Sequence, residues 1–183
     1  MRNLHDFVGA DSGSWRVLSI VPVRGESLPP ASAVTVVPPP GNVAGSSQVW
    51  SLKAQISNLR YAERPEIDVL KSKQEQLGRP GATQAALIPI RKSAAWWDLA
   101  QDERRAIFEA RSRHTAIGLD YLPAVSRQLY HCRDLGEPFD FLTWFEFAPD
   151  NANAFEDLVA RLRATEEWRY VEREVDIRLE RNV

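Results

Sequence analysis

The amino-acid sequence predicts an α+β fold, and three features of the chain indicate it. The second half alternates segments of strand and helix periodicity in the order β-α-β-β-α-β. The first half carries strand patterns and a proline-rich stretch but few helical patterns. The 183 residues, 44% hydrophobic and 26% charged, suffice for one domain or two small ones sharing a core. We therefore expect two related halves, residues 1–84 and 85–183, whose sheets associate into a barrel-like body and of which the first has lost its helices.

The composition argues against nucleic-acid and membrane partners. The chain has 23 basic and 25 acidic side chains and a net charge of −2, whereas nucleic-acid proteins carry a basic surface. Charges interrupt the apolar stretches well before the roughly 20 residues that cross a bilayer, and the N-terminus lacks the apolar run of a secretory signal. The single cysteine, Cys132, excludes an internal disulfide and a metal site built from several thiolates. We expect a soluble protein of the cytoplasm.

In the first half, the sequence predicts two strands of a small sheet. Residues 15–23 are rich in β-branched and apolar side chains, and residues 49–61 show partial alternation. Six of the twelve prolines lie between residues 22 and 40 and a glycine- and serine-containing stretch follows, so residues 22–47 are predicted to form a long loop. The N-terminal residues, with His5, are expected to be mobile.

A strand and a long helix open the second half. Residues 86–92 form the strand, in which the internal Pro89 predicts an edge or bulge position. Residues 98–121 then form the helix, which Pro123 stops. Steps of three and four place an apolar stripe with one histidine on one helical face: Ile107, Ala110, His114, Ile117 and Tyr121.

Two strands, a second helix and a last strand follow. Residues 127–133 and 139–147 form the two strands, joined by a turn. Because side chains alternate along a strand, the second has an aromatic face made of Phe139, Phe141, Thr143, Phe145 and Phe147. An i, i+3, i+4, i+7 stripe from Phe155 predicts an amphipathic helix, and alternation over residues 171–180 predicts a strand with one covered face. This is the order of ferredoxin-like folds, in which both helices cover one face of an antiparallel sheet.

Among the three histidines, His114 is the strongest candidate for a functional group. The chain has no phosphate loop, no Gly-x-Ser-x-Gly motif and no histidine pair at metal-binding helical spacing. A lone histidine on an apolar helical face is more often a core residue than a ligand. One axial histidine nevertheless suffices for haem, because the porphyrin supplies four nitrogens and apolar walls supply most of the binding energy. An ordinary aromatic core is the alternative to haem walls made of residues 139–147 with Trp96, Trp97, Leu122 and Trp144.

Three charged residues complete the candidates. Arg127, at the start of a strand, is either an edge arginine paired with a carboxylate or a fixed cation that holds a small anion in a pocket. Glu167 and Lys92 either form a surface ion pair or pair near His114. In the second case a carboxylate that accepts the far N–H of the imidazole would orient it and push negative charge toward iron. The pattern alone leaves both alternatives open.

Five runs of sequence carry a resemblance to a known family. They are Ala-Leu-Ile-Pro-Ile-Arg-Lys-Ser-Ala-Ala-Trp-Trp (86–97), Arg-Ser-Arg-His (111–114), Tyr-Leu-Pro-Ala-Val-Ser-Arg-Gln-Leu-Tyr-His (121–131), Phe-Asp-Phe-Leu-Thr-Trp-Phe-Glu (139–146) and Arg-Ala-Thr-Glu-Glu-Trp (163–168). The chain resembles the chlorite dismutases, specifically in its second half and more loosely before it. Its length and proline-rich first half resemble the smaller lineage of that family, with a truncated N-terminal subdomain.

The resemblance implies a haem b enzyme that converts chlorite to chloride and dioxygen. It implies a dimeric α+β barrel, a homodimer, with haem in the ferredoxin-like second half and with chlorite and other small anions bound at the distal haem site. Carried over by position, His114 is the proximal ligand of the haem iron and Arg127 the distal arginine, which Gln74 would hydrogen-bond. The remaining positions match groups around the haem: Lys92 and Glu167 on the proximal side, and Trp96 and Trp97 near the haem and the subunit contact.

Two alternatives remain from the sequence. One is a coproheme decarboxylase of haem biosynthesis, in the same superfamily. Relatives of that kind are usually longer, and those of Gram-positive bacteria often lack an arginine at the position of Arg127. The other is a non-catalytic haem-binding or haem-sensing protein on a ferredoxin-like scaffold, which fold alone does not exclude.

Overall fold

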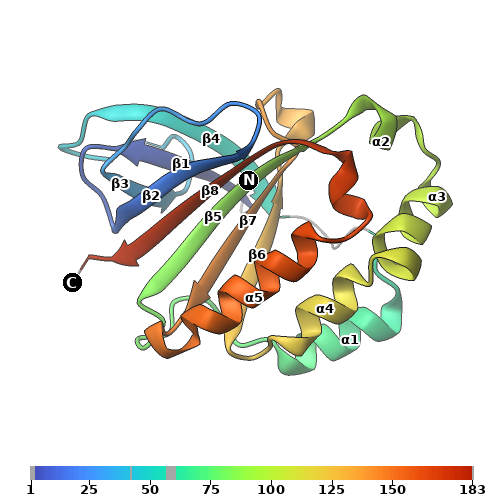
Figure 1. Cartoon of the computed structure of the whole chain (residues 1–183). Helices are drawn as coiled ribbons and strands as arrows, with labels where there is room; N and C mark the ends of the chain where they lie inside the picture. The colour runs from blue at the N-terminus through green and yellow to red at the C-terminus, as the bar shows by residue number, and fades with distance from the viewer. Residues whose placement is uncertain (1–2, 42, 57–60, 183) are drawn as a thin grey trace.

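The computed structural model describes residues 3–41, 43–56 and 61–182, and this part of the chain forms a closed antiparallel barrel with helices on its outside (Figure 1). Around the barrel the strands follow the order β1-β3-β2-β8-β5-β7-β6-β4. The predicted α+β barrel is therefore confirmed. The strands are β1 (Leu4–Ala10), β2 (Trp15–Arg24), β3 (Ala33–Val37), β4 (Gln48–Ile56), β5 (Gln84–Lys92), β6 (Val125–His131), β7 (Phe141–Phe147) and β8 (Val171–Arg181).

The second half has the predicted order of elements. Strand β5, a helical segment, the hairpin of β6 and β7, helix α5 and strand β8 follow one another, and α4 and α5 lie across the same face of the sheet (Figure 1). The helices are α1 (Arg64–Lys73), α2 (Ala94–Asp98), α3 (Gln101–Arg105), α4 (His114–Asp120) and α5 (Ala152–Arg163), with the π-helix η1 (Ala106–Arg111) and the 3₁₀ turns η2 (Arg133–Leu135), η3 (Pro149–Asn151) and η4 (Glu167–Tyr170). The division of the chain at residue 84 stays a prediction.

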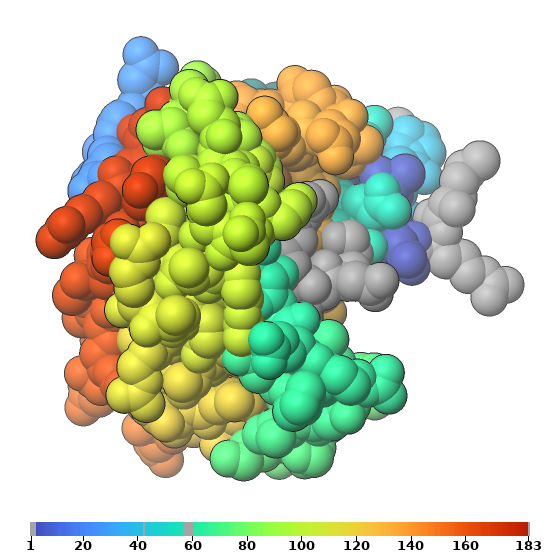
Figure 2. Space-filling view, turned by 90° about the vertical axis from the view of Figure 1, so that its right-hand side faces the viewer, coloured from blue at the N-terminus to red at the C-terminus, as the bar shows by residue number. Residues whose placement is uncertain are grey.

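The first half is more regular than the sequence predicted. Residues 4–10, expected to be mobile, form β1, which pairs with β3 and β4. The predicted loop of residues 22–47 contains the end of β2 and the whole of β3, because the prolines bracket an Ala-Val-Thr-Val-Val segment without interrupting it. Helix α1 also shows that this half has kept a helix. It packs beside α4 on the helical side of the molecule, as Figure 2 shows. Of the predicted strand 49–61, residues 57–60 lie outside the described residues.

The predicted helix of residues 98–121 is wrong as a single element. It is divided into α3, η1 and α4, and Arg113, with φ of 52°, turns the chain just before His114. The Glu109 side chain accepts hydrogen bonds from the backbone N–H of Thr115 (2.7 Å) and Ala116 (3.4 Å), so it caps the new helix. As a result Ala110 is exposed rather than part of an apolar stripe, and His114 occupies the first position of α4.

Two further predictions about strands are corrected. Strand β5 is not an edge strand, because it pairs with both β7 and β8. The pairing with β8 skips Ile88 and Pro89, so the N–H that Pro89 lacks costs the sheet no hydrogen bond to β8. Strand β8 is covered on both faces. Its polar residues Glu174 and Asp176 are buried under α5, where they bind arginines.

The core consists of two apolar clusters on opposite sides of the same strands. Leu142 and Trp144 of β7 fill the barrel interior, whereas Phe145 and Phe147 face outward and pack against Phe155 of α5. Phe139, predicted to share a face with Phe141 and Phe145, lies instead in the interior cluster, because it precedes the start of β7 at Phe141. The outward face of the sheet and the helices thus enclose a second, helix-covered compartment.

Candidate functional site

A cavity lies in the helix-covered compartment and is enclosed from three directions. The sheet supplies a mostly apolar floor, α5 and the η1–α4 segment supply a second side, and the start of α1 supplies a third. Most of the lining is apolar or aromatic, which suits a flat organic cofactor. The walls are formed by Ile88, Ile90, Leu129, Phe141, Thr143 and Phe145 from the sheet, Phe108, Thr115, Val159 and Leu162 from the helical side, and Tyr61, Ala62, Glu66 and Leu70 from α1 and the residues before it.

His114, Glu167 and Lys92 form a triad at this cavity, in which Glu167 and Lys92 are buried. Nδ1 of His114 lies 2.6 Å from Oε2 of Glu167, and Nζ of Lys92 donates to Oε1 of the same carboxylate at 2.7 Å. The Lys92 and Glu167 side chains are 2% and 5% exposed. Burial by itself would raise the pKa of Glu167, but the neighbouring His114 and Lys92 hold it down at about 2. The carboxylate is therefore ionised at neutral pH, and Nε2 of His114 is the nitrogen available to a ligand.

Aromatic rings surround the triad. The ring of Phe108 stacks on His114 with centroids 4.3 Å apart, and that of Trp168 lies 6.2 Å away at an interplanar angle of 24°. The Lys92 ammonium lies over Trp96, 4.5 Å from the ring centroid, and 5.5 Å from the centroid of Trp168. These contacts place the ammonium between electron-rich faces, which attract a cation.

Arg127 reaches the cavity from β6. Its guanidinium packs against α4 at Gly118, where an added Cβ would come within 2.1 Å of Nη1, so a glycine is needed for this approach. Burial lowers the pKa of Arg127 to about 10, which still leaves it protonated near neutral pH. Within residues 3–41, 43–56 and 61–182, no hydrogen bond or ion pair joins this guanidinium to a carboxylate. A cation held in this way can bind an anion that enters the cavity.

The sequence profile of the chlorite dismutases matches residues 44–182. The chain belongs to the chlorite dismutase family. It is 61% identical to the dimeric chlorite dismutase of Nitrobacter winogradskyi, whose crystal structure matches with a TM-score of 0.91 over 97% of this chain and 99% of that one. A chlorite dismutase variant from Candidatus Nitrospira defluvii is 27% identical, with a TM-score of 0.62 over 75% of this chain and 56% of that one.

A shorter match links the chain to the chlorite dismutase of Ideonella dechloratans. The two are 35% identical over 107 residues, which is 55% of this chain and 35% of that protein, so the chain spans about a third of the length of this relative. The resemblance that the five sequence runs indicated is thus confirmed at the level of the family. Among the described residues of this family member, no helix has the length and hydropathy of a membrane span.

Most of the predicted site residues lie together at the cavity. His114, Arg127, Lys92, Glu167, Trp96, Thr143 and Phe145 all line it. Trp97, Leu122 and Gln74 are not among its described lining residues. Trp97 borders a separate polar pocket, where Nε1 donates to Oδ2 of Asp140 at 3.3 Å, and Gln74 ends α1. The roles that the family resemblance implies for these side chains stay predictions.

The wall that α1 supplies was not predicted from the sequence. This helix buries only Leu70, so its apolar stripe is too weak to stand out. Two start features were present: Pro65 in the first turn, and Glu66, whose side chain accepts a hydrogen bond from the backbone N–H of Glu63 at 2.7 Å. Phe108 and Trp168 were also missed, because stacking on His114 depends on the break before α4 and on the fold of η4.

Proposed function

We propose that this chain is a haem b enzyme that converts chlorite to chloride and dioxygen. The observation that carries the proposal is Arg127, a cation without a carboxylate partner in the described part of the chain, which shares a mostly apolar cavity with the anchored imidazole of His114. The N. winogradskyi neighbour, described as a dimeric chlorite dismutase, supports the reaction and the substrate. It also supports a homodimer as the assembled form; the cytoplasmic location stays a prediction from the sequence.

The donor set fits haem. A single imidazole whose Nδ1 is engaged by Glu167 would offer Nε2 to iron, and the phenylalanine and isoleucine side chains of the sheet floor suit a flat macrocycle. When bound, haem supplies the redox-active iron at which the bonds of chlorite are rearranged. His114 would hold the iron, while Phe141, Thr143 and Phe145 would contact the macrocycle.

The residues of the chain divide the remaining work between orientation and charge. Glu167 accepts a hydrogen bond from Nδ1–H of His114. This bond fixes the tautomer and makes Nε2 a stronger electron-pair donor to iron. Lys92 compensates the Glu167 charge and keeps that carboxylate in place. Arg127 stays protonated and cannot act as a base, so its task is to hold chlorite, and then the chlorine-containing anion formed from it, inside the cavity until reaction is complete.

Oxygen release from chlorite tests the proposal directly. Purified chain loaded with haem b and supplied with chlorite is expected to evolve dioxygen at an electrode, and Arg127→Ala is expected to keep its haem and lose turnover. Arg16→Ala is the matched control, because Arg16 is an exposed arginine paired with Glu180 on the barrel surface. His114→Ala is expected to lose haem occupancy itself. Full haem loading without oxygen release would overturn the proposal and favour coproheme decarboxylation. That alternative is tested by supplying coproheme with peroxide and measuring its conversion.

A further inference from the structure

Trp168 contacts the triad from a side that the proposed function leaves without a role. Its ring lies nearly parallel to that of His114, with centroids 6.2 Å apart, and 5.5 Å from the ammonium of Lys92. It directly follows Glu167 in the turn η4, so one short segment presents both the carboxylate and the indole to His114. Any movement of Trp168 would therefore reach all three members of the triad.

A buried carboxylate fixes the indole. Nε1 of Trp168 donates to Oε2 of Glu174 at 2.8 Å, and the other oxygen, Oε1, accepts from Nε of Arg163 at 2.8 Å. The Glu174 side chain is 1% exposed. Burying such a charge is costly unless both oxygens are hydrogen-bonded, so the position of Glu174 depends on both partners. In turn, this carboxylate determines the direction of the indole N–H.

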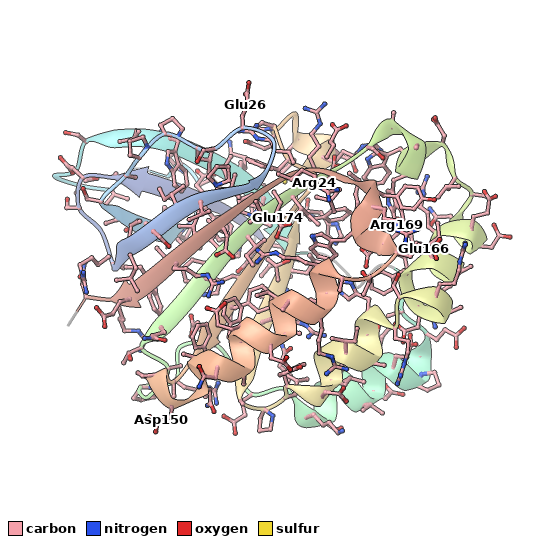
Figure 3. The ribbon with its side chains drawn as sticks, viewed as in Figure 1. Arg24, Glu26, Asp150, Glu166, Arg169 and Glu174 are labelled. Carbon is pink, nitrogen blue, oxygen red and sulfur yellow. The ribbon has the colours of Figure 1, made fainter. Side chains whose placement is uncertain are left out.

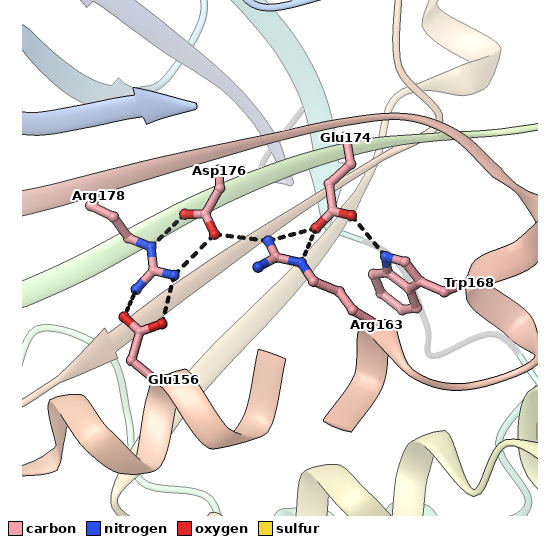
Figure 4. A network of polar contacts seen from close by, with 6 residues as sticks. All are labelled: Glu156, Arg163, Trp168, Glu174, Asp176 and Arg178. Atoms are coloured by element: carbon pink, nitrogen blue, oxygen red, sulfur yellow. Dashed lines mark hydrogen bonds and ion pairs between the residues drawn. The ribbon is translucent and has the colours of Figure 1, made fainter. Parts of the chain in front are cut away.

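Glu174 is the first carboxylate in a row of alternating acidic and basic side chains that leads away from the site, as Figure 4 shows. Arg163 also donates to Asp176 at 2.8 Å, Arg178 bonds Asp176 at 3.0 Å, and Arg178 bonds Glu156 near the surface at 3.2 Å. Arg163, Asp176 and Arg178 each lie between two opposite charges from α5 and β8. Loss of the Glu174 carboxylate would leave Arg163 and Trp168 without their shared hydrogen-bond partner. Glu156 is 60% exposed, so water can take over its hydrogen bonds to Arg178 if its carboxylate is lost.

The main chain of η4 is also held, by an arginine from the first half. Nη1 of Arg24, at the end of β2, donates to the carbonyl oxygens of Trp168 (3.0 Å) and Val171 (2.6 Å). Figure 3 shows Arg24 and Glu174 from their separate strands near this turn. The indole is thus anchored at its N–H and at its backbone, which gives it little freedom to turn.

We propose that Trp168, anchored by Glu174, is a positioning residue that sets the orientation of His114 and the strength of the Glu167–His114 hydrogen bond. The proposal rests on the proposed haem function. A fixed ring parallel to the imidazole restricts rotation of the imidazole about its side-chain bond, and its electron-rich face attracts the Lys92 ammonium that bonds Glu167. Both effects hold the Glu167 carboxylate against Nδ1, and that hydrogen bond determines how strongly the imidazole donates to iron.

The test measures the iron–imidazole bond rather than the turnover. Trp168→Phe and Glu174→Gln, reconstituted with haem b and reduced, are compared by resonance Raman spectroscopy. We expect the iron–imidazole stretching band to broaden and to move to lower frequency in both, and the ferric/ferrous midpoint potential to rise, because a weaker hydrogen bond to Nδ1 makes the imidazole less anionic. Trp168→Phe keeps a flat apolar side chain, so it tests the anchored indole rather than the presence of a ring.

Two matched variants separate positioning from general loosening of the fold. Trp50→Phe removes another indole N–H, which donates to the Pro29 carbonyl at 3.0 Å within the barrel, and Glu156→Gln makes the same carboxylate-to-amide change at the exposed end of the row. Both should leave the band and the potential unchanged. Unchanged spectra in fully loaded Trp168→Phe would overturn the positioning role alone. Failure of the unaltered chain to bind haem would instead overturn the proposed function on which it rests.

Discussion

Among its described lining residues, the cavity holds two kinds of charged residue, those with a charged partner and one without. At the His114 side every charge is paired: Lys92 and Glu167 bond each other, and Glu167 bonds the imidazole. By contrast Arg127, which reaches the same cavity from β6, has no carboxylate partner among the described residues, and burial lowers its pKa to about 10. Paired buried charges make a rigid support, whereas a buried charge left without a partner is a destabilising feature kept for an anion. On the proposed function, the paired charges support His114 and the Arg127 charge serves the substrate.

Replacing Lys92 should give the largest loss of stability. Lys92→Met leaves the Glu167 carboxylate buried with His114 as its remaining partner, which we expect to cost about 3–5 kcal/mol of unfolding free energy. Urea denaturation of the haem-free protein measures it. The neighbouring Arg91→Met is the control, because Arg91 pairs with Glu172 at 2.5 Å on the surface, where the two side chains are 53% and 40% exposed. That pair should be worth about 0–1 kcal/mol. Equal losses in the two variants would contradict the paired-support interpretation.

Acid should weaken the same side of the cavity. The pKa of Glu167 is about 2 in the folded chain, below its ordinary value of 4.5, so the folded state binds its proton less readily than the unfolded state. Its contribution is therefore complete above about pH 4.5 and is lost as the pH falls toward 2. By the usual conversion it amounts to at most about 3 kcal/mol. The unfolding free energy of Glu167→Gln, followed from pH 5 to about pH 3, should fall less steeply than that of the unaltered chain. Parallel slopes would refute this linkage.

The third wall of the cavity is held by a weaker ion pair. Arg105 of α3 donates to both carboxylate oxygens of Glu66 on α1, at 2.8 and 2.9 Å, with both side chains partly exposed. Glu66→Gln should loosen α1 by about 1 kcal/mol and speed haem release about fivefold, measured by transfer to apomyoglobin. Asp68→Asn, which breaks the exposed Arg64–Asp68 pair on the same helix, should leave the release rate unchanged. Equal release rates in the two variants would show that the Glu66 contact does not retain haem.

The two halves of the chain also differ in how far the sequence predicts them. In the second half, strand alternation and the stripe from Phe155 arise from one-sided burial, so β6, β7, α5 and the order of elements follow from local pattern. In the first half, β3 and α1 are short and are stabilised by distant partners. The 3₁₀ turn that carries Glu167 and the helix start at His114 likewise depend on tertiary contacts, among them the 2.9 Å hydrogen bond from the Glu167 N–H to Oγ of Ser112.

The residues of the site could be predicted from the sequence where they lie in the family motifs. The pattern singled out His114 and left the roles of Lys92, Arg127 and Glu167 open until the family motifs assigned them, and nothing in their spacing required them to meet at one cavity. The charges of β8 illustrate the opposite case: alternation suggested that Glu174 and Asp176 face solvent, yet Arg163 from α5 allows both to be buried. The alternation of a strand shows which residues are polar but not which are buried, so it does not predict buried ion pairs.

Removing the Arg127 charge should have the smallest effect on stability and the sharpest effect on function. Arg127→Met fills a similar volume without a cation, and the lowered pKa of Arg127 shows that the folded state disfavours its charge. We expect the unfolding free energy to stay the same or to rise by up to about 1 kcal/mol, while oxygen release from chlorite is lost. Urea denaturation and the oxygen electrode measure the two quantities on one sample. A loss of stability as large as that of Lys92→Met would mean that Arg127 has a carboxylate partner in solution, and the contrast between Arg127 and the paired charges would fail.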